Sequence, residues 1–130
     1  MSQFQGNIKK TYDLEERTAK FSEQTINLVK KINRNDINRN IVQQLIRSST
    51  SIGANYCEAN ASSSKRDFRN KIYICKKESN ETKYWLRMLM NSNPDFKEEI
   101  KRLWEEAHQF HLIFQKVTSS LDKNNKIEKV

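Results

Sequence analysis

A repeating pattern of apolar residues in the last third of the chain places the tightest constraint on its fold. Apolar side chains recur there at alternating steps of four and three: Phe96, Ile100, Leu103, Ala107, Phe110, Phe114, Val117 and Leu121. This heptad pattern places all of them on one side of an α-helix, as in helices that pack lengthwise against other helices. It predicts a helix over residues 95–122, opened by Pro94, and a polar tail over residues 123–130.

Three further stretches show the same spacing and predict three more helices. The helix predicted over residues 65–91 carries Phe68, Ile72, Cys75, Ser79, Thr82, Leu86 and Leu89, with a polar interruption at Ser79 and Thr82. The one over residues 38–60 carries Ile41, Leu45, Ser48, Ile52, Asn55 and Ala59. The first, over residues 12–33, has the sparsest pattern: Leu14, Phe21, Leu28 and Ile32. We therefore expect an all-α chain.

Helix-breaking residues are scarce, which excludes other fold classes. The 130 residues include two glycines and one proline, whereas a β-rich domain needs frequent turns built largely from Gly, Pro, Asn and Asp. A dinucleotide-binding fingerprint or a P-loop also needs more glycine than this. Because the connections between the predicted helices are short, consecutive helices are expected to be antiparallel neighbours. We expect a single domain over residues 1–130, folded as an up-down-up-down antiparallel four-helix bundle.

Small residues gather in the second predicted helix around Gly53. The neighbouring small side chains are Ser48, Ser49, Ser51 and Ala54. A glycine inside a helix costs about 1 kcal/mol relative to alanine, so a close approach by another helix is the reason we favour for its presence. The sequence predicts a tightly packed contact at Gly53.

The net charge of +8 is concentrated on the third predicted helix. Residues 65–87 contain eight basic and three acidic side chains, which gives +5 for this segment. Five of the basic side chains fall on one heptad line, called the basic line below: Lys65, Arg69, Lys76, Lys83 and Arg87. Such a line can follow a phosphate backbone and displace its counterions. The alternative, an ordinary solvated helix face, stays open at this point.

A second stripe runs along the same predicted helix: Ile74, Glu78, Glu81, Trp85 and Met88. Two stripes on one helix indicate two neighbours. Either both neighbours belong to the monomer, or one belongs to the monomer and the other to a second subunit of an oligomer. Because burying an unpaired carboxylate is costly, Glu78 and Glu81 are expected to meet partners, and Lys77 is one helical turn from Glu81. The apolar content of only 35% favours an oligomer that completes its burial between subunits.

No arrangement of residues indicates an enzyme or a cofactor. His108 and His111 are three residues apart, a spacing that allows a two-histidine metal contact, but no carboxylate or cysteine completes such a site from the same turn. We therefore favour a surface or packing role for both histidines and expect no metal.

The location of the protein is inferred from its cysteines and its apolar segments. Cys57 and Cys75 lack the CxxC spacing, and we expect two small buried side chains in a reducing cytoplasm. The chain has no apolar run of transmembrane length and no secretory signal at its start. We expect a cytoplasmic protein without a membrane partner.

Two motifs resemble a known family. They are RSSTSIGANYCEA over residues 47–59 and KKESNETKYWL over residues 76–86, with SKRDF at residues 64–68 between them. Together they resemble the four-helix-bundle family of 23S rRNA intervening-sequence proteins, although many relatives have glycine where this chain has Ala59. The residues that match the family's motif positions are Asn55, Tyr56, Glu58, Glu78, Glu81 and Trp85. The resemblance implies a bacterial protein without known catalytic activity that assembles into a ring-like homopentamer, and a structural or interfacial role for these six residues.

Two functions remain open. The first is binding of structured RNA, such as ribosomal RNA, through the basic line. The second draws on a more distant resemblance to the accessory proteins of diversity-generating retroelements, which form pentamers that engage a reverse transcriptase and nucleic acid. That resemblance implies a protein-docking scaffold for a nucleic-acid-processing partner such as a reverse transcriptase.

Overall fold

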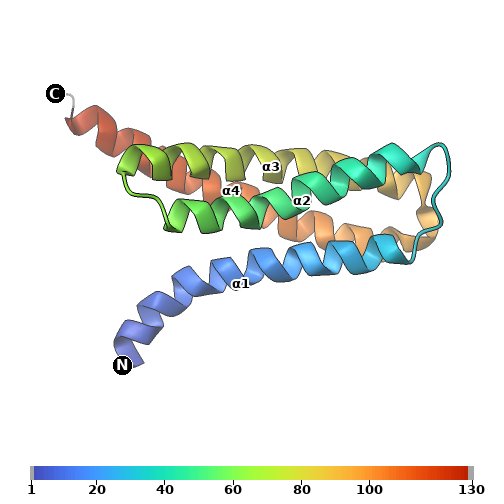
Figure 1. The fold of residues 1–130 in the computed structure, drawn as a ribbon, viewed down its shortest axis with the longest axis horizontal. Helices are drawn as coiled ribbons and strands as arrows, with labels where there is room; N and C mark the ends of the chain where they lie inside the picture. Colours follow the sequence, from blue (N-terminus) through green and yellow to red (C-terminus); the bar gives the residue numbers. More distant parts are fainter. Residues whose placement is uncertain (1, 129–130) are drawn as a thin grey trace.

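The computed structural model describes the backbone of residues 2–128 and the side chains of residues 14–124. It contains four helices, α1 (Ser2–Lys30), α2 (Asn38–Asn60), α3 (Lys65–Ser92) and α4 (Lys97–Glu128), with a 3₁₀ turn, η1 (Pro94–Phe96), ahead of α4. The helices lie lengthwise beside one another and alternate in direction (Figure 1). Since α1 and α3 each pack against α2 and α4, they are diagonal in the bundle. The predicted all-α four-helix bundle is confirmed.

The ends of α2 match the bounds predicted from the sequence, and those of α3 match within one residue. The ends of α1 and α4 differ from the predicted bounds. Helix α1 begins at Ser2, well before residue 12, and ends at Lys30, and α4 continues to Glu128 beyond the predicted end at residue 122. The expected polar tail is therefore helical as far as Glu128. The longer extents of α1 and α4 have one reason: an apolar pattern marks only the part of a helix that packs, whereas the helix itself can continue beyond that part.

Most of the predicted heptad positions lie in the buried core. Phe21 of α1 meets Phe110 of α4 edge to face, with ring centres 5.4 Å apart, and Tyr56 of α2 contacts Phe114 of α4 at 5.8 Å. Other buried members of the predicted patterns are Leu28, Ile32, Leu45, Ile52, Ile72, Cys75, Leu86, Leu89, Ile100, Leu103 and Ala107. Among the residues that the structure describes, no helix is long and apolar enough to cross a membrane.

Two threonines complete the sparse pattern of α1. Thr18 and Thr25 are fully buried at the steps between Leu14, Phe21 and Leu28. Their hydroxyls each donate a hydrogen bond of 2.9 Å to a carbonyl of the preceding helical turn. A hydroxyl satisfied in this way can be buried without leaving an unpaired donor, which is why threonine fills positions that a search for apolar residues passes over.

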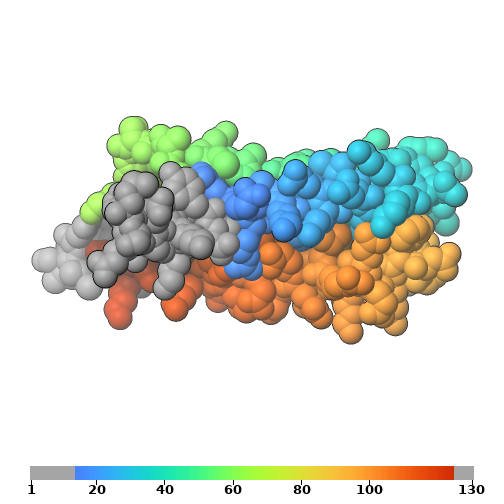
Figure 2. All heavy atoms as spheres, turned by 90° about the horizontal axis from the view of Figure 1, so that it is seen from below, coloured from blue at the N-terminus to red at the C-terminus, as the bar shows by residue number. Residues whose placement is uncertain are grey.

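The predicted close contact at Gly53 is confirmed. A Cβ atom at this position would lie 3.1 Å from Thr18 Oγ1 and 3.3 Å from Thr18 Cβ. One turn earlier along α2, the Ser22 hydroxyl of α1 donates to the Ser49 carbonyl at 3.2 Å. Figure 2 shows α1, in blue, lying between α2 and α4 on this side of the molecule. Small side chains on α2 therefore set how closely α1 can approach.

A buried asparagine joins the two loops at one end of the bundle. Asn38 donates through its amide nitrogen to the Asn33 carbonyl at 3.0 Å and to Asn93 Oδ1 at 3.3 Å. Its Oδ1 accepts from the Asn35 backbone N–H, and Asn35 Oδ1 accepts in return from the Asn38 backbone N–H, both at 2.9 Å. This reciprocal pair caps α2 in the manner of a capping box, and the bond to Asn93 ties the start of α2 to the end of α3.

Candidate nucleic-acid interface

The basic line lies along the border between α3 and α4. Arg69 Nη2 is 2.8 Å from Asp122 Oδ1 near the end of α4, and Lys83 Nζ is 3.1 Å from Nδ1 of His108. Lys65 and Arg87, at the two ends of the line, are exposed, whereas its middle members are half-buried. The basic line therefore borders a neighbouring helix and is not a fully solvated face.

Aromatic rings hold the basic side chains in place along this border. Arg69 lies over the Tyr73 ring with Cζ 4.8 Å from the ring centre, and Lys76 Nζ is 5.7 Å from the same centre. Lys83 Nζ lies 5.5 Å from the centre of the Trp104 ring, and that ring stacks on His108 at 5.2 Å. Such cation–π contacts restrain flexible side chains while leaving their charge in place.

The charge balance differs between the Arg69 end of the border and its centre. At the Arg69 end, Asp122 also accepts a hydrogen bond from the Tyr73 hydroxyl, and this bond raises the pKa of Tyr73. At the centre, the contacts of Lys76 and Lys83 are with rings, and neither pairs with a carboxylate among side chains 14–124. The positive charge of the border is therefore least compensated at Lys76 and Lys83.

Both histidines belong to this border. His111 Nδ1 is buried and has no hydrogen-bond partner among the described residues. Burial, followed by the neighbouring Lys83 cation, lowers the pKa of His111. No group of three or more metal-binding side chains occurs in the described part of the chain. We call Tyr73, Lys76, Lys83, Trp104, His108 and His111 the border cluster; the sequence did not link either histidine to the basic line.

The second stripe of α3 meets α2 inside the monomer. Arg47 Nη1 of α2 lies 3.0 Å from Glu78 Oε2, and its other guanidinium nitrogen contacts Glu81. Trp85 Nε1 donates to Glu81 Oε2 at 3.2 Å. Glu78 and Glu81 therefore do have partners, as predicted, but the main partner is Arg47 across the helix pair. The Lys77 ammonium lies 3.9 Å from Glu78.

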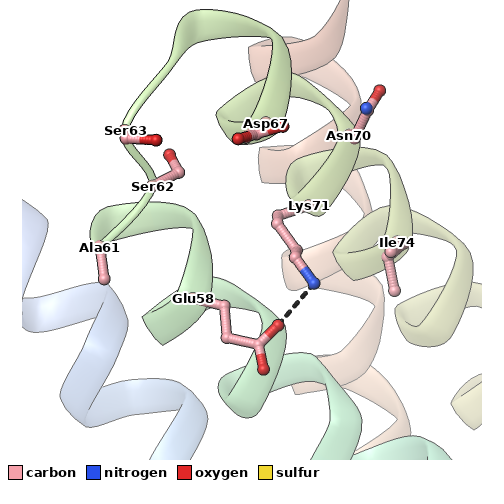
Figure 3. Close-up of a pocket in the computed structure, with 8 residues that line it drawn as sticks. All are labelled: Glu58, Ala61, Ser62, Ser63, Asp67, Asn70, Lys71 and Ile74. Atoms are coloured by element: carbon pink, nitrogen blue, oxygen red, sulfur yellow. Dashed lines mark ion pairs between the residues drawn. The ribbon is translucent and has the colours of Figure 1, made fainter.

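The remaining motif residues occupy separate places along α2. Asn55 donates to the Ser51 carbonyl within α2 at 2.8 Å, and Tyr56 is part of the core. Glu58 is exposed and lies 2.6 Å from the Lys71 ammonium, beside an open hollow of about 520 Å³ (Figure 3). The six motif residues thus do not converge on one site.

Only one of the two cysteines is buried, whereas the sequence predicted that both would be. Cys75 is buried in the core, and burial raises the pKa of its thiol to about 12. Cys57, expected to be buried, is exposed because its position on α2 faces away from the core. Both thiols are free.

The fold and this border define a class: a four-helix bundle whose third helix carries basic side chains that lie over a ring of its own and a ring of the fourth helix. Residues 10–116 match the family described as 23S rRNA-intervening sequence protein, so the chain belongs to that family. A similar solved structure is a protein of unknown function from the S23 ribosomal protein family of Bacteroides thetaiotaomicron. It is 30% identical, with a TM-score of 0.69 over 80% of this chain and 96% of the other. No curated protein sequence matches the chain.

Proposed function

We propose that this protein is a non-enzymatic, oligomeric helical bundle that binds structured RNA through the basic line of α3. The observation that carries the proposal is the pair Lys76 and Lys83, held in place by rings with no carboxylate paired to them among the described side chains. The exposed Lys65 and Arg87 extend the line at its two ends. An RNA backbone supplies phosphates along such a line and releases counterions when it binds.

The arrangement of the rings favours recognition of backbone and shape over recognition of bases. The Tyr73 ring is contacted by Arg69 and Lys76, and the Trp104 ring by His108 and Lys83. A base would have to displace these groups before it could stack. Structured RNA is commonly recognised through phosphates and helix shape.

A salt series with matched charge reversals tests the proposal. The double variant Lys76→Glu/Lys83→Glu is expected to bind a labelled RNA hairpin about tenfold more weakly than the unmutated protein, with a salt slope lower by about two. The control Lys20→Glu/Lys30→Glu makes the same charge change at exposed positions of α1, the helix diagonal to α3. Fluorescence anisotropy measures both. An affinity that depends neither on salt nor on the border lysines contradicts the proposal.

The proposal includes assembly into a ring-like homopentamer in the cytoplasm. The family resemblance and the low apolar content of 35% support the assembly. The two free thiols, one of them exposed, suit a reducing compartment.

A second candidate function is a docking scaffold for a nucleic-acid-processing protein such as a reverse transcriptase. The exposed Tyr84 favours it, because this ring lies on the outside of α3 with its edge toward Trp85, 5.1 Å between ring centres. Co-purification from the native host after nuclease treatment separates the two functions. A partner protein that is retained by the unmutated chain and lost with Tyr84→Ser favours the scaffold.

A further inference from the structure

The chain has only two histidines, and both lie in the border cluster beside the lysines of the basic line. The Lys83 ammonium is 3.1 Å from Nδ1 of His108. Because an ammonium group can only donate hydrogen bonds, this nitrogen acts as the acceptor. The contact therefore occupies Nδ1 of His108 as long as the Lys83 ammonium stays beside it.

His111 lies in surroundings that disfavour its protonated form. Its Nδ1 is buried and has no acceptor among the described side chains. Burial is the main cause that lowers its pKa, and the Lys83, Lys76 and His108 side chains lower it further, while a hydrogen bond with the Lys76 backbone opposes them. Free of ligand, the cluster thus holds two lysines beside His111, whose pKa is lowered.

Among side chains 14–124, no carboxylate is paired with Lys76, Lys83, His108 or His111. On the α1 side of α4, Arg17 and Glu106 pair with each other at 2.7 Å. Towards the end of α4, Asp122 is bonded to Arg69 and Tyr73. The side chains that lower the pKa of His111 are therefore Lys76 and Lys83 from α3, with His108 from its own helix.

We propose that the border cluster is a phosphate-binding site that takes up a proton from solvent when Lys76, Lys83 and His108 bind the phosphates of one RNA strand beside His111. This inference rests on the proposed RNA binding. A phosphate beside Lys83 becomes the acceptor for its ammonium, which frees Nδ1 of His108. The phosphate charge also offsets the two lysines, so that an imidazole can accept a proton and donate a charge-assisted hydrogen bond.

The direction of the pH dependence follows from the pKa of His111 in the free protein and in the RNA-bound protein. Its pKa is lowered in the free protein, and it rises when an anion offsets the neighbouring cations. The bound state therefore holds more protons than the free state at pH values between the two pKa values. Affinity for RNA increases as the pH falls through this interval, by at most about tenfold per pH unit for one proton.

Binding measured over pH tests the inference. The dissociation constant of a fluorescein-labelled RNA hairpin is measured from pH 8.0 to pH 5.5 at constant ionic strength, for the unmutated protein and for His111→Gln. We expect the unmutated protein to bind about five- to tenfold more tightly at the lower pH, and His111→Gln to change by less than about twofold. The control Lys20→Glu/Lys30→Glu, on the diagonal helix, is expected to keep the full pH response.

Proton NMR of the unmutated protein supplies a second measurement, which does not depend on the folding of a variant. Two imidazole resonances are expected, and the one missing from His111→Gln belongs to His111. Its titration midpoint is expected to move to higher pH when the hairpin is added. Equal pH responses of the two proteins, together with an unmoved midpoint, overturn the proton linkage while leaving RNA binding intact. The absence of RNA binding at every pH overturns the proposed function and this inference with it.

Discussion

At the scale of single residues, buried hydroxyl and amide groups and one glycine decide how the helices meet. Thr18 faces Gly53, and its Oγ1 lies 3.1 Å from where a Cβ atom would stand. Asn38 has no exposed surface and binds both loops at its end of the bundle. Each of these residues is buried, and each polar one has its hydrogen bonds made inside the protein. Replacing one of these residues is therefore expected to change stability through close packing or through a lost hydrogen bond, and not only through the apolar area that is buried.

The close approach at Gly53 makes the position sensitive to added volume. Gly53→Val is expected to lower the free energy of unfolding by about 1–3 kcal/mol, because the new side chain overlaps Thr18. The neighbouring exposed position supplies a control: Ala54→Val is expected to lower it by only about 0.5 kcal/mol through helix propensity. Urea unfolding followed by circular dichroism measures both. Equal losses in the two variants would mean that α1 does not pack tightly there.

At the scale of helices, α3 is joined to its two neighbours by different chemistry. Toward α2 it presents carboxylates that share Arg47, with Glu78 almost fully buried. Toward α4 it presents cations that rest on rings. A buried ion pair contributes less to net stability than its geometry suggests, but removal of one partner leaves the other charge unpaired. The α2–α3 contact is therefore more sensitive to loss of Arg47 than to loss of the whole pair.

A double-mutant cycle at Arg47 and Glu78 measures this sensitivity. Arg47→Met is expected to lower the free energy of unfolding by about 1–3 kcal/mol, since it leaves the Glu78 carboxylate without its main partner. Adding Glu78→Met is expected to restore most of the loss, because two apolar side chains can replace a buried pair. Lys77→Met is the control: its ammonium is exposed and 3.9 Å from Glu78, so we expect a change below about 0.5 kcal/mol. Additive effects of the two replacements would rule out coupling between Arg47 and Glu78.

At the scale of the whole molecule, α3 is the best-anchored helix of the bundle. Its contacts with α2 and α4 are more extensive than those that α1 makes with the same two helices. The basic line therefore stands on a helix that is packed firmly against two neighbours, which suits binding by a preformed surface. Helix α3 also carries half-buried Trp85 and exposed Tyr84 next to each other, and an assembly would cover their exposed surface.

The mass of the assembled protein tests the proposed oligomer. Light scattering is expected to give the mass of five chains of 15.5 kDa each. Trp85→Ala, which removes the ring bonded to Glu81, is expected to shift the protein toward smaller species or lower solubility. The exposed change Lys101→Ala on α4 is expected to leave the mass unchanged. A stable monomer of the unmutated protein would contradict the oligomer.

Most of the fold could be predicted because helix patterns are local. Heptad spacing identified all four helices and most of the core, and the bounds of α2 were predicted correctly. The same reasoning missed Thr18 and Thr25, which count as polar although their hydroxyls are satisfied inside the helix. It also ended α4 too early, since residues beyond the packed region continue the helix without an apolar pattern. The close contact at Gly53 was predictable because a glycine in the middle of a helix is destabilising unless close packing requires it.

Less of the candidate site than of the fold could be predicted from the sequence, because the site depends on how the helices pack together. The sequence by itself determined that five basic side chains share one face of α3 and that two carboxylates need partners. Only the packing of the helices decided that Lys83 lies against Trp104 and His108, and that Arg47 meets Glu78. The physical reason is that the spacing of residues along one helix is set by its own turns, whereas the alignment of two helices is set by how all four pack together.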